Sequence, residues 1–281
     1  MAAAEKTTVT VYYLSLDGAY LVPLSLDIPA TDLVARVALE QLLASPPTDL
    51  LQDSVPGDAK LIDLYTIYNT VYVDLTREFL DIPADQMQTA IDAICVTVLP
   101  LADGYKLQLL VEGAGYPELG PVATDEPLTM PLVNPDTRLL DEGSDLADLP
   151  WVRWYQAQEG SPLLIPRSLY YPQDTDPLTA LAQAGLPPGL TLNSISLSDG
   201  VQAAEGLLTL DLSFDPNVAY RCGQAYEQSW LQALARSLCR TTGALSMAVT
   251  IDGQAATALP KGADITRPLA IDTPINYQAL L

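Results

Sequence analysis

The sequence predicts an α+β protein built from two tandem copies of one small two-layer domain. The first observation is a repeated strand motif: "VYVDLTREF" (71–79) has a partner in "LTLDLSF" (208–214). In both stretches apolar and polar residues alternate, as in a half-buried strand, and Asp-Leu is followed by Thr or Ser. The two phenylalanines of the chain, Phe79 and Phe214, each close this stretch. A tandem duplication accounts for the match.

Other stretches of the two halves match in the same order around this motif. The pairs are "TVYYLSLDG" (10–18) with "VRWYQAQEG" (152–160), "LVPLSL" (21–26) with "LLIPRSL" (163–169), "VPGDAKL" (55–61) with "LPPGLTL" (186–192), "LQLLVEG" (107–113) with "MAVTIDG" (247–253), and "LTMPL" (128–132) with "ITRPL" (265–269). Self-similarity that keeps its order indicates repeated structural units. We therefore expect copy one at 1–133, an acidic linker at 134–150, and a divergent copy two at 151–281.

The order of patterned segments in each copy is the second observation. It reads β-β-α-β-β-α-β, which predicts a mainly antiparallel sheet with two helices on one face. Asp17-Gly18 is a hairpin signal between the first two strands. A helix is expected from about Thr31 to Ala44, and its counterpart in copy two lies around 176–185. The proposed apolar face of the first helix is Val34, Val37, Ala38 and Leu42.

The second helix of each copy has the clearest helical periodicity. Its apolar residues in copy one are Met87, Ala90, Ile91, Ile94, Cys95 and Val98, and in copy two Trp230, Leu231, Leu234 and Leu238. Pro83 suits the first turn of the copy-one helix, with Asp81 a candidate cap. Gly243 is expected to end the copy-two helix.

Charge and composition exclude several classes of function. The 281 residues carry 13 Lys and Arg against 35 Asp and Glu, a net charge of −22 that disfavours nucleic acid and anionic lipid. Histidine is absent, which excludes catalysis by an imidazole base and removes the commonest zinc ligand. The linker acids do not follow an EF-hand pattern. Cys95, Cys222 and Cys239 are interpreted as small apolar residues, and a Cys95 disulfide is the alternative.

Asp74 and Asp211, in the repeated motif, are the most conspicuous polar residues in predicted strands. We interpret them as structural acceptors of hydrogen bonds from nearby backbone or hydroxyl groups. A carboxylate-dependent hydrolase is the alternative, because Glu78 and Asp81 follow Asp74 closely. Copy two keeps the Phe but not the spacing of the second acid, which argues against a duplicated active site.

Aromatic residues crowd the opening strands of both copies. They are Tyr12, Tyr13, Trp151, Trp154 and Tyr155. Strands favour such residues for packing, and a platform for a cell-wall glycan is the alternative.

Taken together, the quoted strands, the "VPGDAKL" stretch and the closing "LQLLVEG" resemble the GerM domain of sporulation and spore-germination proteins. The resemblance covers about 7–133 and, more faintly, 150–272. It departs where Ser45-Pro46-Pro47 replaces a Gly-Pro step. The resemblance implies a non-enzymatic, extracytoplasmic scaffold, anchored in its full-length form as an envelope lipoprotein.

We therefore expect no catalytic, cofactor-binding or metal-binding residues and no cofactor. The expected partners are proteins of a sporulation, germination or cell-envelope complex. Binding of peptidoglycan and self-association stay open, and nucleic acid is excluded by charge.

Overall fold

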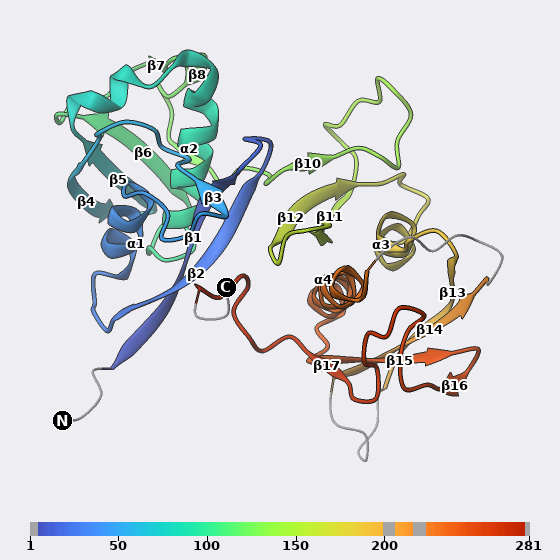
Figure 1. The fold of residues 1–281 in the computed structure, drawn as a ribbon. Coiled ribbons are helices and arrows are strands. Elements are labelled where there is room, and N and C mark those ends of the chain that lie inside the picture. The colour runs from blue at the N-terminus through green and yellow to red at the C-terminus, as the bar shows by residue number, and fades with distance from the viewer. Residues whose placement is uncertain (1–4, 199–205, 216–222, 279–281) are drawn as a thin grey trace. The chain divides into compact units, whose positions relative to one another are not determined.

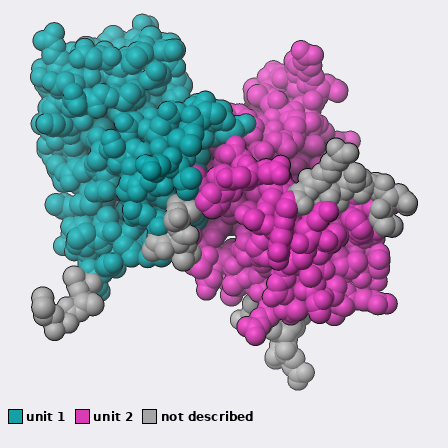
Figure 2. Space-filling view, in the orientation of Figure 1, with its two compact units in different colours: residues 1–133, 275–281 teal, residues 134–274 magenta. Residues whose placement is uncertain are grey.

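The computed structural model describes residues 5–198, 206–215 and 223–278 of the chain, drawn as a ribbon in Figure 1. The chain divides into two compact units, coloured separately in Figure 2. Unit 1 is Met1–Val133 with Ile275–Leu281, and unit 2 is Asn134–Pro274.

Unit 1 holds most of its strands in two sheets. The first sheet has the order β2-β1-β3, with β1 (Lys6–Ser15), β2 (Leu21–Pro29) and β3 (Leu51–Gln52). The second has the order β4-β5-β6-β9, with β4 (Leu61–Ile67), β5 (Thr70–Leu75), β6 (Lys106–Val111) and β9 (Leu128–Thr129). A short hairpin joins β7 (Glu118–Leu119) to β8 (Val122–Ala123). All these pairings are antiparallel except that of β5 with β6.

The helices of unit 1 pack on the buried sides of these sheets. They are α1 (Val34–Leu42), the 3-10 helix η1 (Arg77–Asp81) and α2 (Ala84–Val98). The stripe predicted for α2, from Met87 to Val98, is buried at every position. Because α2 lies between β5 and β6 in the sequence, it is the crossover that their parallel pairing requires. Val71, Val73 and Leu75 of β5 are fully buried.

Two details of the helices in copy one differ from the predictions. Helix α1 begins at Val34 and ends at Leu42, and its buried residues are Ala35, Ala38, Leu39 and Leu42. The stripe is therefore rotated by one residue from the predicted face. Asp81 does not cap α2: it ends η1, and the N-cap of α2 is Pro83, without a side-chain hydrogen bond. The 3-10 helix η1 lies between β5 and α2, and it includes Asp81, the residue that the sequence suggested as the cap.

Unit 2 repeats the plan of unit 1. One sheet has the order β10-β12-β11, with β10 (Pro135–Asp136), β11 (Trp151–Ala157) and β12 (Leu164–Tyr170). The other has the order β13-β14-β15-β16, and β17 also pairs with β15. Its strands are β13 (Leu190–Leu197), β14 (Leu207–Phe214), β15 (Ser246–Ile251), β16 (Gln254–Ala255) and β17 (Leu269–Ala270). As in unit 1, the strands on either side of the second helix, β14 and β15, pair in parallel.

The helices of unit 2 are α3 (Pro177–Gly185) and α4 (Gln224–Thr242). The side chain of Asp176 caps α3 by accepting hydrogen bonds of 3.0 Å from the amides of Leu178 and Thr179. Gly243 ends α4 in the left-handed conformation with φ 78°, as predicted. All four predicted core residues of α4, from Trp230 to Leu238, are buried.

The two units agree in strand register as well as in element order. In unit 1, a shift in register between Leu61 and Asp63 places Asp63 opposite Asp74. In unit 2, a shift between Leu192 and Ser194 places Ser194 opposite Asp211. The predicted α+β class and tandem arrangement are confirmed, with the strands of each unit divided between two sheets.

The segments that follow the two copies do not lie where the sequence predicted. Within 134–150, β10 pairs in parallel with β12 and Asp136 is only 4% exposed. Residues 134–150 therefore belong to unit 2, whereas 275–278, expected in copy two, belong to unit 1. The acidic composition predicted that this segment is exposed to solvent. Part of it is buried instead, where β10 pairs with β12 and Asp136 forms an ion pair with Arg167.

Cys95 and Cys239 are buried free thiols, which agrees with their interpretation as small apolar residues. Cys222 lies outside the described residues. Among the described helices, none has both the length and the apolar character that a membrane crossing requires.

Candidate functional site

The aspartate of the repeated motif holds a tight turn in each unit. An Oδ atom of Asp74 accepts a hydrogen bond of 2.9 Å from the amide of Gly113. Gly113 and the residue before it have φ values of 77° and 52°, in the left-handed region. In unit 2, Asp211 accepts a bond of 2.7 Å from the amide of Gly253, and the turn has the matching φ values of 74° and 52°. The two aspartates therefore stabilise the same turn, which follows the strand parallel to their own.

Asp211 also bonds to side chains, and these contacts favour its charged form. Thr250 donates at 2.6 Å and Asn193 at 2.9 Å. Hydrogen bonds from Thr250, Asn193 and the Gly253 amide, in that order, hold the pKa of Asp211 below its ordinary value. A general acid requires the opposite shift. These contacts support the structural interpretation of the motif aspartates, although their main backbone partner is a strand–strand turn instead of the strand-to-helix turn.

The acids suggested for a hydrolase gather away from Asp74. Glu78 and Asp81 border a pocket of about 230 Å³ together with Asp58, and Asp74 does not line it. The hydrogen bond with Thr76 is the main cause that lowers the pKa of Glu78. The residue facing Asp74 across the strands is Asp63, which is paired with Arg36 at 2.5 Å. Among the described residues, no group of three or more potential ligands is arranged for a metal ion.

The aromatic residues of the opening strands do not form one exposed platform. Tyr13 is buried, and its hydroxyl donates to the carbonyl of Gln41 at 2.8 Å. Trp154 and Tyr155 line a groove of about 850 Å³ in unit 2 between β11, α3 and α4. Their side chains are only 5% and 4% exposed. The guanidinium of Arg138 lies 4.8 Å from the centre of the Trp154 ring.

Unit 1 instead exposes a cluster of aromatic and aliphatic side chains that sequence reasoning missed. We call it the β4 patch; it consists of Tyr65, Ile67, Tyr68, Tyr72 and Tyr105. Tyr65 and Tyr72 stack with ring centres 5.1 Å apart, on strands that pair at this position. Tyr68 is 95% exposed and Tyr105 80%. The amide of Tyr105 donates to Asn69, the neighbour of Tyr68, so the two exposed rings belong to adjoining segments.

The stacked tyrosine pair has no aromatic counterpart in unit 2. The positions that correspond in register to Tyr65 and Tyr72 are Ser196 and Thr209. The duplication therefore kept the sheet but not the aromatic surface. The run "LIDLYTIYN" (61–69) was the available signal, because apolar and aromatic residues fall on both faces of an edge strand and only one face can pack on the core of the unit.

A family model matches copy one, and a solved tandem structure has the same fold as the whole chain. Residues 10–116 match the family model named Germane, described as sporulation and spore germination. The tandem GerMN domains of the sporulation protein GerM from Bacillus subtilis have the same fold, with a TM-score of 0.67. That similarity covers 97% of this chain and 99% of that one at 18% identity. The chain has GerM-like tandem domains.

Two further solved structures match about half of the chain. The first GerMN domain of the same Bacillus subtilis protein is 20% identical and covers 44% of this chain and 97% of its own, with a TM-score of 0.40. A putative lipoprotein from Clostridium perfringens is 17% identical and covers 46% of this chain and 92% of its own, with a TM-score of 0.33. No curated protein sequence matches the chain.

The GerM resemblance read from the sequence is thus confirmed. The family match lies within copy one, and the tandem fold includes the more divergent copy two. The matched family is one of sporulation and germination proteins and is not a known enzyme family.

Proposed function

We propose that this GerM-like protein is a non-enzymatic scaffold that binds a partner protein in a sporulation, germination or cell-envelope complex. The β4 patch carries this proposal. Strand β4 lies at the edge of its sheet, with Tyr65, Ile67 and the adjoining Tyr68 exposed. Soluble proteins usually protect such edges with charged residues or proline, because an open edge invites pairing with another chain. Aromatic side chains are also enriched at protein interfaces.

The occupant that fits this edge is an extended segment of a basic partner protein. An open edge strand can accept a partner strand by backbone hydrogen bonding, while pockets and rings beside it select the side chains. The net charge of −22 attracts a positively charged partner and increases its rate of association.

The proposed location is outside the cytoplasm, with the full-length form anchored as a lipoprotein, as the GerM resemblance implies. Fractionation of the producing cells, followed by protease treatment of intact cells or protoplasts, tests this location. The protein should sediment with membranes and be digested from the outside. Recovery in a protease-resistant soluble fraction would contradict the proposed location.

The scaffold proposal is tested with a variant that gives unit 1 the residues of unit 2. In the double variant Tyr65→Ser with Tyr72→Thr, both new residues already occupy the corresponding positions of a similar sheet. We expect this variant to fold and to lose the partner. Leu16→Ser is the matched control, because Leu16 is 62% exposed and lies outside the patch in the same unit.

The partner is to be captured from sporulating cells, purified, and added back to the wild-type chain. Hydrogen exchange should then show protection of the β4 amides, and the double variant should bind at least tenfold more weakly than Leu16→Ser. Equal binding by the two variants, or protection confined to other strands, would overturn the proposal.

A further inference from the structure

A short arm follows each copy of the domain, and each arm ends on the free edge of a sheet. The arm after copy one is 134–136 and the arm after copy two is 275–278. In unit 1, the amide of Ser25 donates to the carbonyl of Asn276 at 3.2 Å. The side-chain amide of Asn276 donates to the carbonyl of Pro23 at 2.7 Å. The arm thus extends the sheet beside β2.

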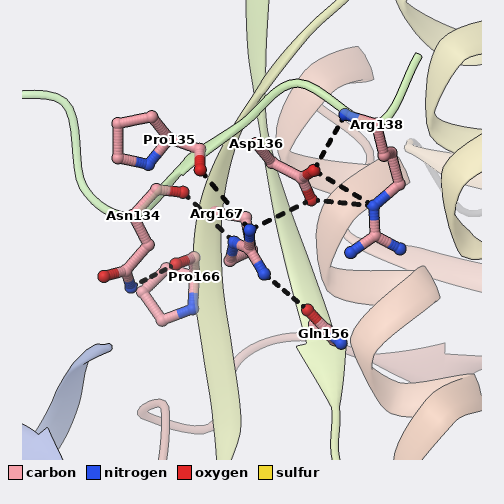
Figure 3. Close-up of polar contacts among 7 residues, drawn as sticks. All are labelled: Asn134, Pro135, Asp136, Arg138, Gln156, Pro166 and Arg167. Carbon is pink, nitrogen blue, oxygen red and sulfur yellow. Dashed lines mark hydrogen bonds and ion pairs between the residues drawn. The ribbon is translucent and has the colours of Figure 1, made fainter. Parts of the chain in front are cut away.

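The arm of unit 2 makes the same contacts with β12, as Figure 3 shows for its labelled residues. The side-chain amide of Asn134 donates to the carbonyl of Pro166 at 2.8 Å. The amide of Ser168 donates to the carbonyl of Asn134 at 3.3 Å. In both units the residue after the asparagine pairs in parallel with the serine of the strand: Pro135 with Ser168 in unit 2, and Tyr277 with Ser25 in unit 1.

The backbone of the two asparagines is also the same. Asn134 has a φ of 48° and Asn276 a φ of 46°. Asparagine is one of the few residues other than glycine that tolerates this left-handed conformation, and here its side chain also satisfies a strand carbonyl. Pro23 and Ser25 occupy the same positions in "LVPLSL" as Pro166 and Ser168 in "LLIPRSL". The strand edge and the asparagine arm that binds it have therefore been duplicated together.

Neither unit uses the arm that follows its own copy. The arm after copy one belongs to unit 2, and the arm after copy two belongs to unit 1. The contact between arm and strand is therefore already a contact between one copy and a segment attached to the other. A copy in another molecule presents the same strand edge, and the same hydrogen bonds would form there.

We propose that the edges of β2 and β12 are strand-addition sites for the asparagine arm, and that a second copy of this chain supplies the arm when molecules exchange it. Exchange of the 275–278 arm uses the edge of β2, so it is distinct from partner binding at the β4 patch. Exchange of the 275–278 arm in both directions would give a closed dimer, and exchange in one direction an open chain of molecules.

The residues around each asparagine distinguish the two sites. In unit 1 the hydroxyl of Tyr277 donates to Asp27 at 2.7 Å. In unit 2, Arg167 bonds to the carbonyls of Asn134 and Pro135 and forms an ion pair of 3.5 Å with Asp136 (Figure 3). An arm from another molecule should therefore enter the site that matches its own sequence. We expect the 275–278 arm to bind at β2 and not at β12.

Two complementary full-length variants test the exchange. Asn276→Gly keeps the left-handed backbone accessible but removes the side-chain donor, which weakens the arm and leaves the β2 edge intact. Ser25→Ala removes the hydroxyl that donates to the carbonyl of Ile275 at 2.6 Å, which weakens the site and leaves the arm intact. Each variant alone should be mainly monomeric. Mixed at about 100 μM, they should form a heterodimer detectable by sedimentation, because one supplies the edge and the other the arm.

A labelled peptide spanning 272–278 provides a second measurement that does not depend on dimer formation. It should bind the Asn276→Gly chain at least tenfold more tightly than the wild type, whose own arm competes at a high effective concentration. A peptide with Gly in place of Asn276 is the control and should bind neither. A monomeric mixture together with equal peptide binding to wild type and variant would overturn the proposal. Its failure would leave the Tyr65→Ser, Tyr72→Thr test of the β4 patch unaffected.

Discussion

The carboxylate of Asp211 accepts a hydrogen bond of 2.7 Å from the backbone amide of Gly253, 42 positions along the sequence. Asp74 has the same relationship with Gly113 in unit 1. The residue before each glycine is also held by a backbone hydrogen bond. The amide of Glu112 donates to the carbonyl of Leu75, and the amide of Asp252 donates to the carbonyl of Leu212. These two leucines directly follow the two aspartates. The repeated Asp-Leu motif is therefore a device for closing the turn after the parallel strand.

Replacing Asp211 by Asn should destabilise unit 2 in a pH-dependent way. The folded pKa lies below the ordinary value of 3.8 because of bonds to Thr250, Asn193 and Gly253. The charged form is thus favoured by folding, so its contribution is full above about pH 4 and is lost as the pH falls through the folded pKa. Thermal melts of wild type and Asp211→Asn should differ at pH 7, and the difference should shrink as the pH falls below the ordinary value of 3.8. A difference that persists unchanged at low pH would contradict this role.

Replacing Asp74 by Ala should lower the stability of unit 1 by about 1–3 kcal/mol, because the Gly113 amide loses a charge-assisted acceptor. Asp74→Asn should cost less, since the amide oxygen can still accept the bond. Hydrogen exchange of the β5 and β6 amides measures the change within unit 1. Equal stability of Asp74→Ala and wild type would show that the turn closes without the carboxylate.

Glu227 is fully buried in the first turn of α4 and accepts backbone bonds of 2.9–3.1 Å from Lys261 and Ala263. Met87 holds the equivalent place in the apolar stripe of α2. Glu227→Met keeps the volume but removes the acceptor, so it should cost about 1–3 kcal/mol for each of the two amides. Denaturant unfolding of unit 2 measures the loss. Met87→Leu is the control for a change of side-chain shape and should cost less than about 1.5 kcal/mol.

The buried thiols should resist modification in the folded protein. Burial raises the pKa of Cys95 to about 12 and that of Cys239 to about 11. Because the thiolate is the reactive form, both thiols should react at least a hundredfold more slowly than a free cysteine at pH 8. A Cys222→Ser background makes the assay with a chromogenic thiol reagent specific to these two. Rapid labelling of one equivalent before denaturation would contradict their burial.

Local periodicity was sufficient to predict the helices and the duplicated strands. The residues from Met87 to Val98 were identified as a core stripe because helical spacing is visible within one segment. The rotation of α1 was missed, since Leu39 and Val37 are both apolar and only packing decides between them. The β4 patch was missed because residues 61–68 place apolar side chains on both faces of the strand, and the sequence does not indicate which face is covered.

Contacts between distant segments could not be predicted in this way. The stretches containing Asp74 and Gly113 were each matched to their counterparts, but their pairing depends on the crossover through α2. The arm residues Asn134 and Asn276 lie in segments whose composition indicates loops. Their binding to β12 and β2 depends on backbone pairing, which leaves little trace in composition.

The position of the 275–278 arm also determines when unit 1 can complete its fold during synthesis. Unit 1 takes its last segment from residues that the ribosome makes only after all of 134–274. At roughly 5–20 residues per second, this delay is about 7–28 s. During that interval the β2 edge of unit 1 is not yet paired with the arm. A chaperone that covers exposed strand edges would therefore matter most to the nascent chain at this stage.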